Sequence, residues 1–261
     1  MLEVRNLALG YPHQPLATDI QAQLPPSQLT LLLGRNGCGK STLLRTIAGL
    51  QPPVDGELWW GDTRFDLLPR EARARHVALV MTQQPAPRHL TVAELVALGR
   101  TPHTNIFGRL TDHDQQIVAQ ALADCQLSAL AHRPLATLSD GERQRAMIAR
   151  ALAQDTPLLL LDEPTAFLDF PAKVEMIAWL AQMAHQRQKS VLLSTHDLEV
   201  ALQLADHIWL LSRANLIAGS PQALASDGTL AAHFASSTLR FDAEALRFVP
   251  NSEFPSPAFS L

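Results

Sequence analysis

The chain lacks most of what a secreted or membrane-spanning protein needs. Its 261 residues include only two cysteines, Cys38 and Cys125, which provide no disulfide framework and fit a reducing compartment. No apolar run approaches the ~20 residues that span a bilayer, and the segment after Met1 shows no basic region followed by an apolar stretch. We therefore expect a cytoplasmic protein whose membrane association, if it has one, comes from a protein partner.

An excess of one charge is also missing. The formal net charge is −4, so the composition offers no global attraction to nucleic acid or to anionic lipid. The hydrophobic content of 47% is sufficient for one large core, or for a core and a smaller subdomain. Nucleic acid is therefore not an expected partner.

A glycine-rich loop carries the strongest functional signal that is present. Residues 34–42 follow an apolar run and match the pattern G-x-x-x-x-G-K-[ST]. The glycines let backbone N–H groups surround a phosphate, the lysine reaches the β- and γ-phosphates, and the following hydroxyl can ligate Mg²⁺. The residues of this loop that we expect to contact the bound ligand are Gly34, Asn36, Gly37, Cys38, Gly39, Lys40, Ser41 and Thr42.

Two carboxylates follow a run of four leucines at residues 158–161. Ligands of α/β sheets bind at the carboxyl ends of strands, so Asp162 and Glu163 are well placed for chemistry. We assign Asp162 to Mg²⁺, which it would hold through a water, and Glu163 to the base that polarises the attacking water. An acidic turn after a core strand is the alternative interpretation, and the phosphate loop makes it the weaker one.

Short β-type runs alternate with amphipathic helical segments, which predicts an α/β fold with a mostly parallel sheet. Residues 2–11 and 57–60 alternate differently and predict an antiparallel β layer beside that sheet. The expected strands of the parallel sheet are 29–33, 77–80, 158–161, 191–194 and 208–211. The expected division is a nucleotide-binding core (1–84 and 155–213), an inserted helical subdomain (85–154) and a partly loosely ordered C-terminal extension (214–261).

A helix is expected to begin near residue 139. Ser139 and Glu142 satisfy the S-x-x-E capping box, and a helix N-terminus with a hydroxyl and a glycine N–H can bind an anion. An ordinary capped helix without a ligand is the alternative. Taken alone, the pattern does not decide between the two.

Three motifs in this order resemble the nucleotide-binding subunit of an ATP-binding cassette (ABC) transporter: the phosphate loop at 34–42, the signature at 138–144 and the acidic strand end at 158–163. The resemblance covers about residues 2–212. It implies a P-loop NTPase core of the ABC ATPase type and the activity of an ATP hydrolase. The same resemblance implies two copies packed head to tail, with ATP on Lys40 of one chain completed by Ser139 and Gly141 of the other.

The resemblance also implies roles for residues that chemistry alone does not single out. Tyr11 would stack on adenine, and Asp169 would couple the two sites of the dimer. Gln83 would sense Mg²⁺ and the attacking water, although the adjacent Gln84 leaves the register open. His196 would contact the γ-phosphate as a switch residue.

The signature departs from the usual family pattern at one position. Asp140 stands where the family has glycine, and a carboxylate near a γ-phosphate is repelled unless it points away. Aspartate tolerates left-handed backbone better than most residues, so the family's backbone shape remains accessible. Asp140 therefore receives no role.

Residues 95–103, followed by Gly108, Arg109 and Asp112, resemble the insert of ATPases that serve bacterial importers of iron–siderophore complexes, haem and cobalamin. The signature and residues 167–170 and 239–242 favour the iron–siderophore branch. The resemblance implies a polytopic permease that contacts residues 83–109, an indirect substrate-binding protein, and a peripheral position on the cytoplasmic face of the inner membrane.

Other functions remain open on the sequence. The ATPase could serve haem, cobalamin or an exporter, or be a soluble ABC ATPase acting on ribosomes or DNA. A P-loop enzyme that phosphorylates a small molecule would need an acceptor pocket and no signature. His103 and His113 belong to no close constellation of carboxylates or thiols, so we expect them to be surface residues and not a metal site.

Overall fold

The computed structural model describes the chain except residues 12–13, 83–88, 106, 167, 235–238 and 251–261. The strands of its central sheet are β3 (Leu29–Leu33), β6 (Val77–Val80), β7 (Leu158–Asp162), β8 (Ser190–Ser194), β9 (His207–Leu211) and β10 (Leu216–Gly219). Their order is β10-β9-β3-β8-β7-β6, and neighbours are parallel except β10 with β9.

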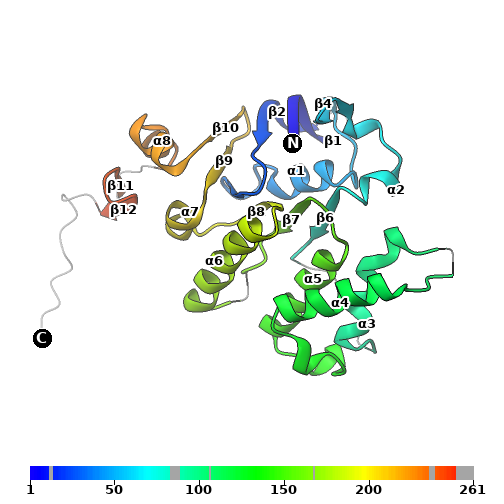
Figure 1. Ribbon diagram of the computed structural model, residues 1–261. Helices are drawn as coiled ribbons and strands as arrows, with labels where there is room; N and C mark the ends of the chain where they lie inside the picture. Colours follow the sequence, from blue (N-terminus) through cyan, green and yellow to red (C-terminus); the bar gives the residue numbers. More distant parts are fainter. Residues whose placement is uncertain (12–13, 83–88, 106, 167, 235–238, 251–261) are drawn as a thin grey trace, which may run out of the picture.

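A second, antiparallel sheet lies beside the first, in the order β2-β1-β4-β5 (Figure 1). Its strands are β1 (Leu2–Tyr11), β2 (Gln14–Leu24), β4 (Asp55–Trp60) and β5 (Thr63–Arg64). The predicted strands of both sheets are therefore confirmed, as is the α/β fold with its separate antiparallel layer.

Helices lie in several of the connections between these strands and in the chain that follows β10 (Figure 1). The α-helices are α1 (Lys40–Ile47), α2 (Arg70–Arg73), α3 (Val92–Ala97), α4 (Asp112–Asp124), α5 (Asp140–Ala153), α6 (Phe170–Gln186), α7 (Leu198–Leu204), α8 (Pro221–Ser226) and α9 (Thr229–Phe234). The 3₁₀ helices are η1 (Phe65–Leu67), η2 (Leu98–His103), η3 (Ser128–Leu130) and η4 (Leu135–Thr137).

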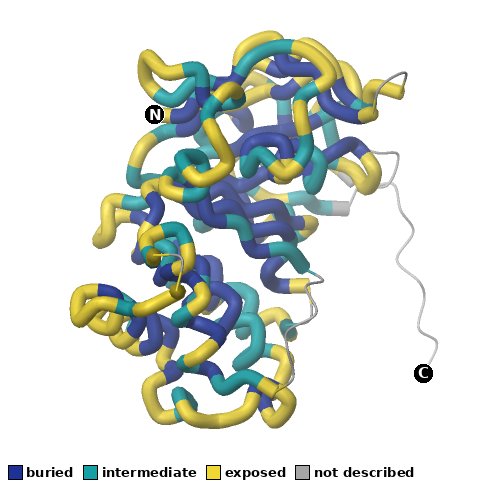
Figure 2. Tube along the Cα trace, turned by 90° about the vertical axis from the view of Figure 1, so that its right-hand side faces the viewer, coloured by how far each residue is buried: buried dark blue, intermediate teal, exposed yellow. Residues whose placement is uncertain are grey.

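The central sheet is buried on both faces, which explains its near-continuous leucine runs (Figure 2). Successive strand side chains point to opposite faces. In β3, Leu31 faces a core that it shares with α5, α6 and α7, whereas Leu32 faces a second core formed with α1 and the antiparallel sheet. Leu159 and Leu160 of β7 divide in the same way. Helix α1 is therefore held between the two sheets.

The helical insert is held together by a buried ion pair. Arg100 is 3% exposed; its Nε donates to Asp114 Oδ1 over 2.8 Å, and its Nη1 donates to the Ala153 carbonyl, at the end of α5, over 2.9 Å. A Cβ on the preceding Gly99 would lie 2.1 Å from the Arg150 carbonyl oxygen, so only glycine fits there. These two residues, which carried part of the family resemblance, thus pack the insert internally.

The core sheet continues beyond residue 213, where we expected it to end. Strand β10 pairs with β9 at the edge of the sheet. Further on, β11 (Leu239–Asp242) and β12 (Arg247–Pro250) form an antiparallel hairpin, and β12 contacts α7. The described residues between 216 and 250 therefore contain more regular structure than the sequence predicted. The division into core, helical subdomain and extension remains a prediction.

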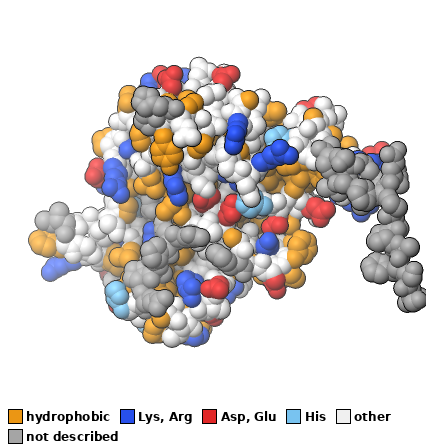
Figure 3. All heavy atoms as spheres, turned by 180° about the vertical axis from the view of Figure 1, so that it is seen from behind, with side chains coloured by type: hydrophobic (Ala, Val, Ile, Leu, Met, Phe, Trp, Pro, Cys, Tyr) orange, Lys and Arg blue, Asp and Glu red, His pale blue; other side chains and the backbone are white. Residues whose placement is uncertain are grey.

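In the part of the chain that the structure describes, no helix combines the length and the apolar composition that a membrane crossing requires. On the face seen in Figure 3, basic and acidic side chains are interspersed and neither sign gathers in one area.

Candidate functional site

The phosphate loop leaves β3 and enters α1 through glycines that other residues could not replace. Gly39, the N-cap of α1, has a φ of 108°, in the region that L side chains rarely adopt. At Gly34 a Cβ would lie 2.4 Å from the Leu211 carbonyl oxygen of β9. The loop therefore lies directly against the sheet. The first amides of α1, which have no partner within the helix, are available to bind an anion in the loop.

Lys40 is buried at the start of α1, with 6% of its surface exposed. Its Nζ donates to the carbonyl oxygens of Gly34 over 2.9 Å and Arg35 over 3.4 Å. The ammonium is thus held against the loop by backbone acceptors. Cys38 is buried in the same loop, and burial raises the pKa of its thiol, which makes it a packing residue and not a nucleophile.

The acidic end of β7 meets this loop. Asp162 is 6% exposed, and its Oδ1 accepts hydrogen bonds from Ser41 Oγ over 3.0 Å and from Ser194 Oγ over 2.8 Å. The donor set of hydroxyl and carboxylate oxygens fits the oxygen ligands that Mg²⁺ prefers. Ser41 and Asp162, predicted from separate motifs 121 residues apart, are therefore in direct contact.

Glu163 adjoins this contact. Its amide donates to Ser194 Oγ over 2.9 Å, and its backbone has a φ of 48°. The Glu163 carboxylate contacts Nε2 of His196, which lies beyond the end of β8. The structure therefore brings together the predicted base and the predicted switch histidine.

These groups surround one open cavity of about 460 Å³. The residues that line it are Leu16, Asn36, Gly37, Gly39, Lys40, Ser41, Thr42, Glu163 and His196. Leu16 comes from β2 and was not predicted. Tyr11, at the end of β1, is 57% exposed and is not among these lining residues.

The signature residues lie elsewhere. Ser139 is the N-cap of α5 and forms the predicted capping box: it accepts from Glu142 N over 3.3 Å, and Glu142 Oε2 accepts from Ser139 N over 2.8 Å. Asp140 is exposed and pairs with Arg143, Nη1 to Oδ1, over 3.0 Å. Its carboxylate is thus compensated within its own helical turn.

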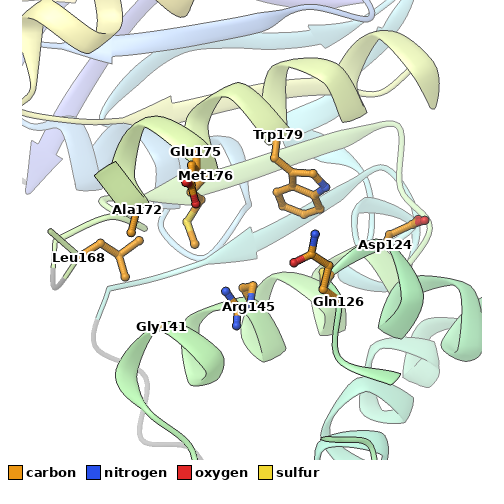
Figure 4. Close-up of a pocket in the computed structure, with 10 residues that line it drawn as sticks. Asp124, Gln126, Gly141, Arg145, Leu168, Ala172, Glu175, Met176 and Trp179 are labelled. Carbon is orange, nitrogen blue, oxygen red and sulfur yellow. The ribbon is translucent and has the colours of Figure 1, made fainter. Parts of the chain in front are cut away.

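Gly141 lines a different, largely apolar cavity between α5 and α6 (Figure 4). Leu168, Met176 and Trp179 cover it from the side of α6, and Arg145 lies beside Gly141 on α5. Asp169 is the exposed N-cap of α6, and its Oδ1 accepts from Ala172 N over 3.2 Å. Among the described residues of one chain, the signature therefore does not line the phosphate-loop cavity.

Two candidate positions cannot be placed, and besides Leu16 two contributing residues were not predicted. Gln83 and Gln84 lie outside the described residues. Thr82, just before them, donates its Oγ1 to the Asp162 carbonyl over 2.5 Å. Together with Ser194 it fixes the acidic strand end. The sequence signal for both was a hydroxyl residue at or just after the end of a strand that neighbours β7: Thr82 follows β6, and Ser194 ends β8.

Residues 17–166 match the protein family described as ABC transporter. The achromobactin transport ATP-binding protein CbrD of Dickeya dadantii is 40% identical over 204 residues, which are 78% of this chain and 76% of CbrD. The ferric enterobactin transport ATP-binding protein FepC of Escherichia coli is 35% identical over 222 residues, which are 85% of this chain and 82% of FepC. A solved ABC transporter in an inward-facing conformation aligns with a TM-score of 0.79 and 29% identity, over 96% of both chains.

Proposed function

Because this chain belongs to the ABC transporter family, as an ATP-binding and ATP-hydrolysing subunit, we propose that it drives a bacterial importer of iron–siderophore complexes. The supporting observation for the motor function is that Lys40, Ser41, Glu163 and His196 line one cavity. Asp162 is hydrogen-bonded to Ser41 of this lining. The proposal for the cargo is supported by relatives named for the transport of achromobactin and ferric enterobactin.

Each group at the cavity has a role in the proposed hydrolysis. Lys40 and the loop amides bind the β- and γ-phosphates and neutralise their charge. A bound Mg²⁺ would be held through Ser41 and Asp162, with Gln83 as a further contact, and would neutralise charge that develops on the phosphate oxygens. Tyr11 is proposed to stack on adenine.

Glu163 acts as the base in this proposal. Its carboxylate accepts a proton from the attacking water and orients that water towards the γ-phosphorus, which contributes about 10²–10⁴-fold. His196 already contacts that carboxylate. It can therefore keep Glu163 in place and donate to the γ-phosphate when ATP enters the cavity.

A second copy of the chain completes the site. Ser139 is exposed at the start of α5, whose N-terminus favours an anion, yet it does not line the phosphate-loop cavity of its own chain. In a head-to-tail homodimer, Ser139 and Gly141 reach the ATP held by the partner, and Asp169 links the two sites. Each charge-assisted hydrogen bond between the signature and the ATP stabilises the closed dimer by about 1.5–3 kcal/mol, and these bonds are lost when ATP is hydrolysed.

Residues 83–109 are the proposed contact with a polytopic permease at the cytoplasmic face of the inner membrane. Leu98 is 50% exposed and Phe107 is 78% exposed on this segment, so apolar surface is available for a partner. A substrate-binding protein would act indirectly, through the permease. The alternatives are an importer of haem or cobalamin, an exporter, and a soluble ABC ATPase that has no permease.

The test of the motor function compares two variants of the full chain. Glu163→Gln keeps the phosphate contacts, so we expect it to bind ATP and accumulate as a closed dimer without turnover. Lys40→Ala should fail to bind ATP. Steady-state hydrolysis at the wild-type rate by Glu163→Gln would reject the base assignment. Co-purification with its permease, followed by uptake of ferric siderophores, haem and cobalamin into vesicles, decides the cargo.

A further inference from the structure

Ser194 links the two catalytic acids, and nothing in the proposed function uses it. It is fully buried at the end of β8. Strands β7 and β8 are parallel, with Asp162 paired to Ser194. Leu160 and Leu192, two residues earlier in each strand, both face the core that contains α1. By the two-residue period of a strand, Asp162 and Ser194 also face α1, where Ser41 lies.

The hydroxyl of Ser194 forms a different hydrogen bond with each of the two acidic residues. It donates its only hydrogen to Asp162 Oδ1 over 2.8 Å and accepts the amide hydrogen of Glu163 over 2.9 Å. A hydroxyl has one donor and two acceptor positions, so these two bonds fix its orientation. One oxygen atom thus sets both the side chain of Asp162 and the backbone of Glu163.

The backbone of Glu163 needs such support. Its φ of 48° lies in the left-handed region, which a non-glycine residue occupies only when its surroundings hold it there. The bond from Glu163 N to Ser194 and the bond from Thr82 to the Asp162 carbonyl lie on both sides of the Asp162–Glu163 peptide. The orientation of this peptide determines the direction in which the Glu163 side chain points at the end of β7.

We propose that Ser194 is a positioning residue for ATP hydrolysis, which orients Asp162 towards the metal and Glu163 towards the attacking water through one hydroxyl. The inference rests on the proposed roles of Asp162 and Glu163. Ser194 itself touches neither phosphate nor water in this scheme. Its loss should therefore affect the chemical step and the use of Mg²⁺ more than the binding of ATP.

The test is Ser194→Ala in the full chain. We expect kcat to fall about 10-fold and the Mg²⁺ concentration for half-maximal activity to rise about 10-fold, as is typical when a partner behind a metal-binding or catalytic group is removed. The KM for ATP at saturating Mg²⁺ should change by less than about 2-fold. Ser194→Thr keeps the hydroxyl and should recover most of both losses.

Ser190→Ala is the matched control, because Ser190 lies at the opposite end of β8 and bonds to the Pro25 carbonyl over 3.1 Å. It should leave kcat and the Mg²⁺ dependence unchanged. If Ser194→Ala only lowers the melting temperature, with wild-type kcat per folded chain and wild-type Mg²⁺ dependence, Ser194 is merely structural and the proposal is wrong. Failure of Ser194→Thr to recover activity while it melts like wild type would also overturn it.

Glu163→Gln, measured in parallel, separates this inference from the proposed function. Wild-type turnover by Glu163→Gln rejects the base itself, and the inference then loses its premise. An inactive Glu163→Gln together with a fully active Ser194→Ala rejects only the role of Ser194.

Discussion

The phosphate-loop cavity and the signature end of α5 are built in opposite ways. At the cavity, Lys40 is buried, and so is Asp162 behind it, which is bonded to Ser41 of α1 and Ser194 of β8. At the signature, Ser139 and Asp140 are exposed, and their side chains bond within the first turn of their own helix. In the first region, side chains from distant segments of one chain are bonded to one another. In the second, the exposed Ser139 and Asp140 leave surface on which the proposed dimer would place the partner's ATP.

The largest expected effect comes from charging the signature. Gly141→Asp, made in the Glu163→Gln background, adds a carboxylate where the partner's triphosphate would lie. Among the described residues, the added Cβ meets only Leu168, at 3.4 Å. We expect ATP-driven dimerisation to weaken by more than about 100-fold through like-charge repulsion, measured by light scattering. Binding of ADP to the single chain should change less than about 2-fold.

Gly141→Ala serves as the control for this substitution, since it adds the same Cβ without charge and should still dimerise. If Gly141→Asp also abolishes ADP binding, or if it dimerises like its parent, the two regions are not separate halves of one site.

Removing the buried ion pair of the insert should have the next largest effect. Arg100→Met leaves Asp114 buried without its cation, so we expect a loss of about 3 kcal/mol in the free energy of unfolding. The melting temperature should fall by roughly 6–12 °C. Arg187→Gln breaks the exposed pair with Asp124 and should cost no more than about 1 kcal/mol. An equal loss for both variants would show that burial of the pair is unimportant.

The same pair predicts a dependence on pH. The hydroxyl and amide of Thr111, followed by the Arg100 guanidinium, hold the pKa of Asp114 well below its usual range. Because the pKa of Asp114 is lower in the folded state than in the unfolded state, its ionised carboxylate stabilises the fold at pH values above the unfolded-state pKa of about 3.9. This stabilisation is lost as the pH falls below that value. In melts at pH 7, 5, 4 and 3, Asp114→Asn should be less stable than wild type at pH 7, with a gap that narrows below about pH 4. A constant gap would contradict this.

The smallest effect is expected at Asp140. Its carboxylate is 70% exposed and paired with Arg143, which reduces repulsion of a nearby phosphate. Asp140→Asn should therefore strengthen ATP-driven dimerisation by less than about 3-fold. A gain of 100-fold would mean that the carboxylate faces the nucleotide.

Much of the cavity could be predicted because its parts are local in sequence. Leucine runs buried on both faces marked β3, β7 and β8, and the residues that follow β3 and β7 carry the loop and the acids. The resemblance to ABC transporter subunits is confirmed by the family match and by the relatives. The capping box at Ser139 was predictable for the same reason, since all its bonds lie within four residues.

The remaining features depend on how distant segments pair. Nothing local indicates that β8 lies between β3 and β7, so the bond from Ser194 to Asp162 was not foreseen. Leu16 reaches the cavity from the antiparallel sheet. Gly99 was read as a family marker, although its role is the close approach of η2 to the Arg150 carbonyl, which a one-dimensional pattern does not contain.

The two backbone acceptors of Lys40 have a consequence for turnover. Its Nζ already has partners in the Gly34 and Arg35 carbonyls, so an arriving phosphate exchanges hydrogen bonds and does not simply add them. When the product leaves, the ammonium of Lys40 can bond to the same carbonyls again, so the buried cation keeps hydrogen-bond partners. Release of the spent nucleotide is thereby eased, which suits a subunit that must empty its cavity in every cycle.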